Sequence, residues 1–232
     1  TRHVPILVLA DPDDNGRLLR SLDLGVNDYV VRPIDKNELF ARVRTQIRRQ
    51  RYTAQLRDTF HHSVELAITD QLTSLHNRRY MENHLGLLVA KAQRTGGQLS
   101  LLIIDIDYFK AIIDNYGHDA GDDVLRNFSE RLRKNVRGID LVCRYGGEEF
   151  VVVLPDTDLN LASLIGERLR TRIAGDGFPI HDGQQAINVT ISVGIAALDS
   201  PEDTPESLIK GADRALYSAK RDGRNRVVAC AA

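Results

Sequence analysis

The feature that most restricts the fold of this chain is a long stretch without a helix breaker: neither glycine nor proline occurs between Pro33 and Gly86. Asp35, near its start, can act as an N-cap, and apolar residues follow at helical spacing. These residues are Leu39, Val43, Ile47, Tyr52, Leu56, Phe60, Val64 and Ile68. The sequence therefore predicts one helix from Asp35 to Thr69, about 50 Å long at about 1.5 Å per residue.

A single apolar stripe on such a long polar helix needs a surface to pack against. A second copy of the chain would supply one, and the helix would then be a stalk and a dimer contact. The alternative is that the helix lies on its own domain. We favour the homodimer as the simpler hypothesis.

The residues before this helix indicate part of an α/β domain. Val4–Leu9 is typical of a short buried strand, the region near Asn15–Leu24 of a helix, and Val26–Val31 of a second strand. Strand, helix, strand and helix in this order predict an open parallel sheet. Two strands alone cannot bury both faces of such a sheet.

From Asp70 onward, helical and β-rich segments alternate. The predicted helices are Arg79–Ala92, Tyr108–Tyr116, Asp122–Val136, Leu159–Ile173 and Glu206–Arg221, with breaks near Gly117 and Gly121. The predicted strands are Leu99–Ile104, Leu141–Tyr145, Phe150–Leu154, Val189–Ala196 and Arg226–Ala229. The pattern predicts an α+β domain with a mostly antiparallel sheet.

Composition limits the classes of partner. The 232 residues carry a formal net charge of −1, so there is no overall attraction to a nucleic acid polymer or an anionic membrane. Apolar runs such as Phe150–Leu154 are far shorter than the roughly 20 residues that cross a bilayer. Cys143 and Cys230 have neither metal-ligand nor redox spacing. We expect a cytoplasmic protein with reduced thiols and no membrane insertion.

Three stretches carry side chains suited to phosphate and metal chemistry. Asp105 follows the apolar strand Leu99–Ile104, where its carboxylate could ligate a hard cation or simply cap the next helix. Gly146 and Gly147 form a hairpin turn that a phosphate could approach. The adjacent Glu148 fits a phosphate only with a divalent cation between them; otherwise it is a solvated acid.

The third stretch is basic and lies far downstream. Lys220 and Arg224 fall near a predicted helix end, where they could contact phosphate oxygens. Basic residues at this position also complement the helix dipole without binding any ligand.

Together these stretches resemble the GGDEF family of diguanylate cyclases. The similar motifs are Asp70-Gln71-Leu72-Thr73 through Asn77-Arg78-Arg79, Asp105-Ile106-Asp107-Tyr108-Phe109-Lys110, Gly117-His118-Asp119-Ala120-Gly121-Asp122 and Gly146-Gly147-Glu148-Glu149-Phe150, in the family's order and spacing. The match runs from about Asp70 to Ala229. With its upstream part, the whole chain resembles response regulators of the PleD type.

The resemblance implies a fold similar to nucleotidyl cyclases and polymerase palms, and an enzyme that condenses two GTP into cyclic di-GMP. Asp105, the carbonyl of Ile106 and Glu148 would bind two Mg²⁺ or Mn²⁺ ions, with Asp105 and Glu148 as catalytic residues. The residues implied around GTP are Phe109, Lys110, Asp122, Gly146, Gly147, Lys220 and Arg224. Since each domain holds one GTP, two domains must face each other.

The family also has an inhibitory site for its product, with the motif Arg-x-x-Asp shortly before the signature. Arg137-Gly138-Ile139-Asp140 matches it, and Arg168 matches a helper arginine. Arginine suits the O6 and N7 edge of guanine. The alternative for Arg137 and Asp140 is a solvated helix end.

The resemblance predicts three parts: residues 1–50 as the C-terminal half of a flavodoxin-like receiver domain, 51–69 as a helical linker, and 70–232 as the GGDEF domain. A receiver's phosphorylated Asp lies in the half that does not match. Ala10 stands where a switch Ser or Thr is usual, and Arg32-Pro33 replaces Lys-Pro. We expect this segment to serve dimer packing and not to accept phosphate.

One departure concerns GTP recognition. The family usually has an Asn that contacts guanine where this chain has Ile113, which also fits an apolar helix face with Phe109, Ile112 and Tyr116. We expect weaker base recognition with chemistry retained. A catalytically weak domain that senses cyclic di-GMP is therefore a second hypothesis, and a purely structural dimerisation unit is a third.

Overall fold

The computed structural model describes residues 4–13, 20 and 23–231. The chain divides into two compact units, Thr1–Glu65 and Leu66–Ala232, and each is described by itself. None of the helices within the described residues is long and apolar enough to cross a membrane.

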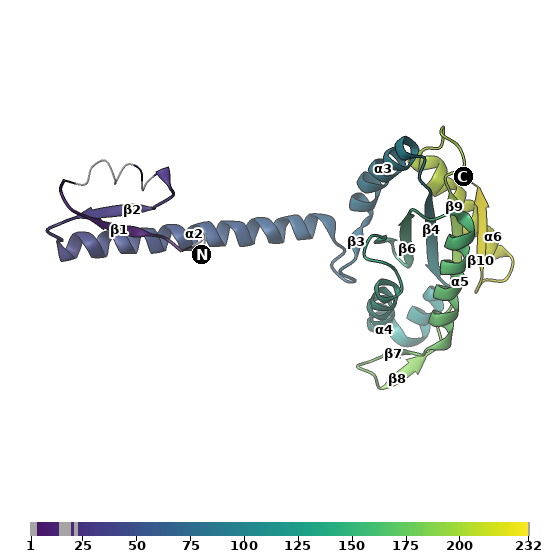
Figure 1. Cartoon of the computed structure of the whole chain (residues 1–232). Coiled ribbons are helices and arrows are strands. Elements are labelled where there is room, and N and C mark those ends of the chain that lie inside the picture. The colour runs from purple at the N-terminus through teal and green to yellow at the C-terminus, as the bar shows by residue number, and fades with distance from the viewer. Residues whose placement is uncertain (1–3, 14–19, 21–22, 232) are drawn as a thin grey trace. The chain divides into compact units, whose positions relative to one another are not determined.

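The first unit places two parallel strands beside a long helix (Figure 1). The strands are β1 (Leu7–Ala10) and β2 (Asp28–Val31), and the helix is α2 (Lys36–Ile68). Asp35 Oδ1 accepts hydrogen bonds from the N–H groups of Asn37 and Glu38, at 2.8 and 2.9 Å. The predicted long helix and its N-cap are thus confirmed. The helix predicted near Asn15–Leu24 lies largely outside the described residues.

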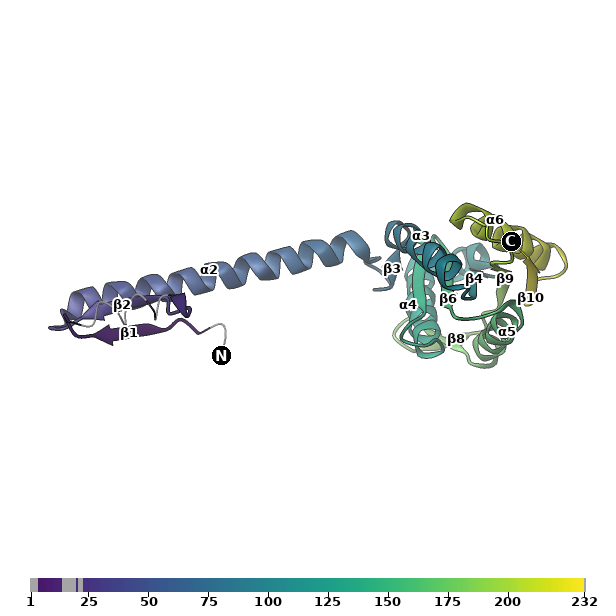
Figure 2. The same ribbon diagram turned by 45° about the horizontal axis from the view of Figure 1, so that its top comes forward.

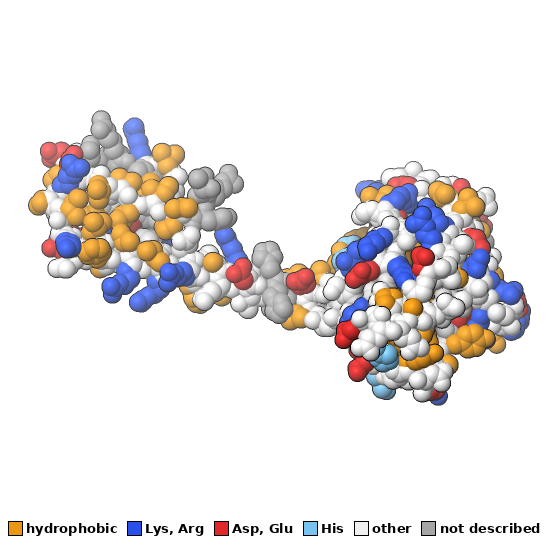
Figure 3. Space-filling model, turned by 90° about the horizontal axis from the view of Figure 1, so that it is seen from below, with side chains coloured by type: hydrophobic (Ala, Val, Ile, Leu, Met, Phe, Trp, Pro, Cys, Tyr) orange, Lys and Arg blue, Asp and Glu red, His pale blue; other side chains and the backbone are white. Residues whose placement is uncertain are grey.

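Two strands and one helix leave apolar side chains of this unit exposed, as Figure 3 shows. Those before α2 are Val4, Ile6, Leu9, Leu24, Val31 and Ile34. Those along α2 are Phe40, Val43, Ile47, Tyr52, Leu56 and Val64. Most of the apolar stripe of the helix, from Val43 to Leu56 and at Val64, is therefore left exposed by the described residues.

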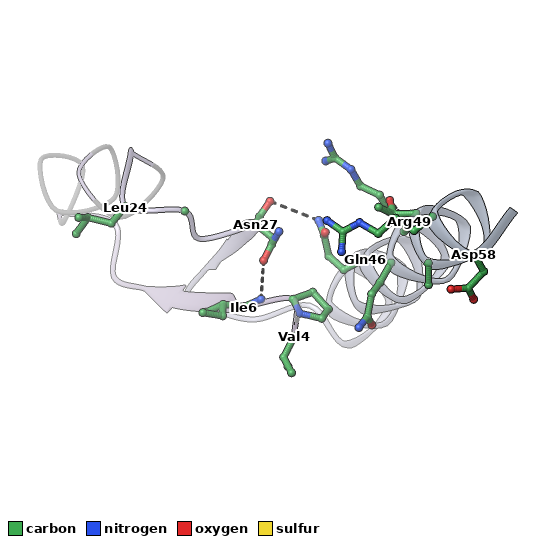
Figure 4. Close-up of a pocket in the computed structure, with 13 residues that line it drawn as sticks. Val4, Ile6, Leu24, Asn27, Gln46, Arg49 and Asp58 are labelled. Atoms are coloured by element: carbon green, nitrogen blue, oxygen red, sulfur yellow. Dashed lines mark hydrogen bonds between the residues drawn. The ribbon is translucent and has the colours of Figure 1, made fainter. Parts of the chain in front are cut away.

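A pocket of about 800 Å³ opens between the segment before β1, the segment before β2, and α2 (Figure 4). The side-chain oxygen of Asn27 accepts a hydrogen bond from the N–H of Ile6 at 2.8 Å, and Gln46 donates to the carbonyl of Asn27 at 3.5 Å. None of the residues that line it was predicted as a site residue.

The second unit contains a six-stranded sheet in the order β10-β9-β4-β6-β5-β3. These strands are β3 (His76–Asn77), β4 (Leu99–Ile106), β5 (Leu141–Gly146), β6 (Glu149–Pro155), β9 (Ile191–Ala197) and β10 (Val227–Ala231). The central strand β4 runs antiparallel to both β6 and β9, and β5 is antiparallel to β6, while the outer pairs β10–β9 and β3–β5 are parallel. The prediction of an α+β fold with a mostly antiparallel sheet is confirmed.

Helices cover both faces of this sheet (Figure 2). They are α3 (Arg78–Thr95), α4 (Phe109–Lys134), α5 (Leu159–Gly175) and α6 (Pro205–Arg221). Along β4, Leu102 and Ile104 pack toward α4 and α5, whereas Leu101 and Ile103 pack toward α3 and α6. Successive strand residues point to opposite faces, and both faces are covered, so β4 is buried along its whole length and apolar except at Ser100 and Asp105.

The helix α6 lies directly against β9 at Gly194. A Cβ atom added to Gly194 would stand 2.1 Å from the carbonyl oxygen of Ala212 and 2.2 Å from the nitrogen of Leu216. Only glycine permits this distance between helix and strand. Because α6 carries Lys220, the contact also sets the position of that side chain.

Three details differ from the sequence-based expectations, and one of them is the two-residue strand β3, which was not predicted. The hairpin of β7 (Phe178–Ile180) and β8 (Gln185–Ile187) was not predicted. The break expected near Gly121 is wrong: only Gly117 is non-helical within α4, with φ 86° and ψ 170°. Gly121 instead gives room to a neighbour, since an added Cβ would lie 3.0 Å from Cγ1 of Ile113.

Candidate active site

Asp105 lies near the end of the central strand, at a corner shared by three strands. It is 7% exposed and is paired in the ladder with Glu149 of β6 and Ser192 of β9. Its Oδ2 forms an ion pair of 2.7 Å with Nζ of Lys220 from α6. The fold thus joins a carboxylate and a lysine that are far apart in the sequence.

Glu148 reaches the same corner through the turn between β5 and β6. The N–H of Ile106 donates a hydrogen bond of 3.3 Å to the carbonyl of Glu148. Burial raises the pKa of Asp105 to about 6; Lys220 lowers it, and the charges of Glu148 and Glu149 raise it further. The backbone contact with Ile106 and the pairing of Asp105 with Glu149 bring both glutamates next to the end of β4.

The donor atoms at this corner fit a magnesium ion. Asp105 and Glu148 would supply carboxylate oxygens, and Ile106 would supply a carbonyl. No three His, Cys, Asp or Glu side chains form a closed metal cage among the residues that the structure describes. Mg²⁺ does not require one, because it takes one or two carboxylates together with water and substrate phosphates.

The turn between β5 and β6 is open on its outer side. Gly147 has φ 47°, which a residue with a side chain adopts only under strain. No described atom lies within 4 Å of a Cβ added to Gly146 or Gly147. A nucleotide could therefore lie close to this backbone.

Arg144 fixes the turn, and sequence reasoning missed this role. Its Nε donates to the carbonyl of Gly147 at 2.9 Å, and its Nη1 lies 3.1 and 3.2 Å from the two carboxylate oxygens of Asp70. Burial works to raise the pKa of Asp70, but hydrogen bonds from Thr73 and Arg144 outweigh it and hold the pKa below its ordinary value. The first motif of the domain is thereby linked to the hairpin. Asp70 stood in the first quoted motif and Arg144 in the predicted strand Leu141–Tyr145, but nothing in the sequence paired them.

Phe109 and Lys110 begin helix α4, after the two residues that follow β4. No side chain among the described residues caps this end, so its first N–H groups can meet an anion. The ring of Phe109 is buried in the core, so only its backbone can face a phosphate. Lys110 is exposed. The guanidinium of Arg224 lies 4.7 Å from the ring of Tyr108, at the same end of the helix.

Asp122 and Ile113 lie near each other across the kink at Gly117. Ile113 packs beside Gly121, the residue before Asp122. Asp122 is half-buried, and its carboxylate stands 3.8 Å from Arg126. Ile113 is therefore packed against the residue that precedes Asp122 in the helix.

The residues of the predicted inhibitory site lie beyond the far end of α4. Arg137 donates to Asp140 through Nη2 at 2.9 Å and to Oγ1 of Thr157 at 2.8 Å. The side chain of Asp140 is 2% exposed and that of Arg137 is 45% exposed, so Asp140 holds the arginine while Arg137 faces solvent. Arg168 donates to the carbonyl of Asn135, two residues before Arg137 in the chain.

Comparison with known proteins supplies an independent result. A family model described as "Diguanylate cyclase, GGDEF domain" matches residues 67–226. Over all 232 residues the chain is 56% identical to "Response regulator PleD" of Caulobacter vibrioides, and it covers 51% of that relative's length. It is 44% identical to "Diguanylate cyclase DosC" of Escherichia coli over 158 residues, which are 68% of this chain and 34% of DosC. The chain thus spans about half or less of the length of these relatives.

Solved structures share the architecture. The coiled coil and GGDEF domain of DgcB from Caulobacter crescentus, in complex with c-di-GMP, aligns with a TM-score of 0.75 and 30% identity over 83% of this chain and 99% of that one. Diguanylate cyclase SiaD from Pseudomonas aeruginosa, in complex with its activator SiaC, aligns with a TM-score of 0.68 and 32% identity, over 94% of this chain and 81% of SiaD.

Proposed function

The chain belongs to the GGDEF family, and on that premise we propose that it condenses two GTP molecules into cyclic di-GMP, with release of two pyrophosphates. The observation that carries the proposal is the meeting of Asp105, Ile106 and Glu148 at one corner, with Lys220 beside them. The relatives named diguanylate cyclases support the same reaction.

Asp105, the carbonyl of Ile106 and Glu148 would hold two Mg²⁺ or Mn²⁺ ions, which when bound activate a 3′ hydroxyl and neutralise charge on the α-phosphate. In the reaction, the 3′ oxygen of one GTP forms a bond to the α-phosphorus of the other while the bond to pyrophosphate breaks. Lys220, Lys110 and Arg224 carry the positive charge that the triphosphate requires. The backbone N–H groups of Phe109 and Lys110 add donors at the start of α4.

The remaining predicted residues orient the nucleotide. Gly146 and Gly147 leave room for it against the hairpin, and Asp122 accepts hydrogen bonds from guanine N–H groups. Each domain holds one GTP, so two copies of the chain must face each other. The apolar stripe on α2, exposed at Tyr52 and Leu56, supports a homodimer.

Turnover of GTP by the purified chain tests the proposal. With Mg²⁺ or Mn²⁺ we expect cyclic di-GMP, at a rate per molecule that rises with protein concentration because the active form is a dimer. Absence of product with both metals at every concentration would refute the proposed function.

Substitution of Ile113 by Asn tests base recognition. We expect the KM for GTP to fall by about 10- to 100-fold, since pairing one base donor or acceptor contributes about 1–3 kcal/mol. Discrimination against ATP should increase by a similar factor. Ile113→Val is the control, because it keeps an apolar side chain beside Gly121. An unchanged KM in Ile113→Asn would contradict the role given to this position.

A sensor of cyclic di-GMP is the second candidate function. The exposed guanidinium of Arg137, held in place by buried Asp140, favours it, as does the c-di-GMP complex of the DgcB structure. Arg137 would donate to O6 and N7 of guanine, with Arg168 as a helper. In an active enzyme the same site would cause product inhibition.

Titration with cyclic di-GMP tests this site. We expect Arg137→Ala to weaken binding by about 10- to 100-fold, because one bidentate arginine–guanine contact contributes about 1–3 kcal/mol. Arg214→Ala, on the outer face of α6, is the control. Equal binding by both variants would mean that the product binds elsewhere.

A further inference from the structure

Asp107 is a buried carboxylate that the proposed mechanism does not use. It is 4% exposed and directly follows Ile106, whose carbonyl is a predicted metal ligand. Three groups donate to it: the hydroxyl of Ser192 to Oδ1 at 2.7 Å, the hydroxyl of Thr190 to Oδ2 at 2.7 Å, and the N–H of Asn225 to Oδ2 at 3.0 Å. Buried polar groups are normally hydrogen-bonded, so these three donors identify the groups that the Asp107 carboxylate holds in place.

The bond to Asn225 reaches the turn between α6 and β10. This turn contains three consecutive residues in left-handed conformation: Gly223, Arg224 and Asn225, with φ of 118°, 60° and 43°. The last two are not glycines, so surrounding contacts must hold their backbone in place. The N–H of Arg224 is fixed by the carbonyl of Ala219 at 3.0 Å, and that of Asn225 by Asp107.

A second contact holds the turn from the opposite side. Nη1 of Arg170, from α5, donates to the side-chain oxygen of Asn225 at 2.9 Å. Asn225 is thus attached through its backbone to Asp107, the residue after β4, and through its side chain to α5. Arg224, the residue before it, extends over the ring of Tyr108 and so over the start of α4.

We propose that Asp107 is a positioning residue: its carboxylate fixes the turn at Asn225 so that Arg224 is placed for the triphosphate. The proposal rests on the proposed function for its catalytic consequence, but the contact itself can be tested without turnover. It assigns the second acid of the Asp-Ile-Asp motif to the phosphate-binding side, whereas the first acid binds metal.

The chemistry of the contact selects the variants. In Asp107→Asn, the amide oxygen can still accept from Asn225 and Thr190, and the amide nitrogen can donate to the hydroxyl of Ser192. In Asp107→Leu, a side chain of similar size accepts nothing, and the N–H of Asn225 loses its partner. The two variants therefore separate loss of the hydrogen bond from loss of the charge.

Kinetics provide the first measurement. We expect Asp107→Leu to lower kcat/KM for GTP by about 10- to 100-fold, mostly through KM, because displacement by about 1 Å can have this effect. Asp107→Asn should restore most of kcat/KM. In an Arg224→Ala background, Asp107→Leu should cause less than about a twofold further loss, since both changes remove the same contact. Asp203→Leu is the matched control, because Asp203 closes another loop by accepting from the N–H groups of Asp199 and Ser200.

Hydrogen exchange of the Asn225 amide provides the second measurement, without nucleotide or metal. We expect exchange about tenfold faster or more in Asp107→Leu and close to wild type in Asp107→Asn. If the wild type forms no cyclic di-GMP, the proposed function fails while this measurement still decides the contact. The proposal is overturned if the Asn variant is as impaired as the Leu variant, if the losses from Asp107→Leu and Arg224→Ala multiply independently, or if exchange at Asn225 is the same in all variants.

Discussion

Asp105→Asn is expected to lower cyclic di-GMP formation by about a thousandfold or more. The substitution keeps the size of the side chain but removes the negative charge that a divalent cation requires. Metal-assisted charge stabilisation is worth several kcal/mol, and roughly 4 kcal/mol corresponds to a thousandfold in rate. The measurement is initial rate at saturating GTP and Mg²⁺.

The same variant should not be less stable than the wild type in metal-free buffer at pH 7.5. Burial raises the pKa of Asp105 in the folded chain to about 6, above the ordinary 3.8. Between these values the folded state holds a proton that the unfolded state has lost, so stability falls as pH rises through this window. Asparagine carries no charge and avoids this loss. Thermal unfolding with a chelator present is the measurement, and an unfolding temperature equal to or above that of the wild type is expected.

Asp213→Asn is the matched control for both measurements, since Asp213 is exposed on α6 and lies outside the site. It should leave rate and unfolding temperature unchanged. If Asp105→Asn kept more than about a tenth of the wild-type rate, the metal role of Asp105 would be wrong. A large drop in its unfolding temperature would instead attribute the lost rate to misfolding.

Gly194→Ala is expected to produce the second large effect, by separating α6 from the sheet. The added methyl group would lie 2.1 Å from one backbone atom of α6 and 2.2 Å from another, and neither belongs to a flexible side chain. Overpacking of this kind costs about 3 kcal/mol or more, which corresponds to a fall on the order of 10 °C in unfolding temperature. The shift of α6 should also draw Lys220 away from Asp105 and reduce the rate of GTP turnover.

Two other glycines calibrate this result. At Gly166 an added Cβ would be 3.0 Å from Cδ1 of Ile195, the end of a side chain that can move, so Gly166→Ala should lower the unfolding temperature less. At Gly86, in α3, no described atom lies within 4 Å, and alanine favours a helix by up to about 1 kcal/mol. Gly86→Ala should therefore be neutral or stabilising. Unfolding of all three variants at the wild-type temperature would contradict the close packing of α6 on β9.

Periodicity predicted the regular elements well. The helix α2 followed from apolar residues at helical spacing in a stretch without glycine or proline, and β4 from the largely apolar segment Leu99–Ile104, which is buried on both faces. The hairpin of β7 and β8 was missed because three-residue strands are too short to show alternation. Gly121 was taken as a break because isolated glycines often end helices, but here it makes room for Ile113.

The position of the acidic corner could also be predicted from the sequence. A strand that ends at Asp105 and a hairpin that contains Glu148 can meet if their strands are neighbours, and β4 and β6 are neighbours. Contacts between segments that are distant in the sequence could not be predicted in this way. The pairs Asp105–Lys220, Asp70–Arg144 and Asp107–Asn225 depend on the order of strands in the sheet, which local patterns do not reveal.

The pair of Asp70 and Arg144 has a consequence for how signals could enter the domain. Asp70 comes two residues after the last residue of α2, and Arg144 joins it directly to the carbonyl of Gly147. A torsion that reaches Asp70 from the end of that helix would act on this ion pair and, through Arg144, on the diglycine turn. Such a coupling depends only on the end of α2. Different upstream domains could therefore act on the diglycine turn in the same way, provided that each of them twists this end of the helix.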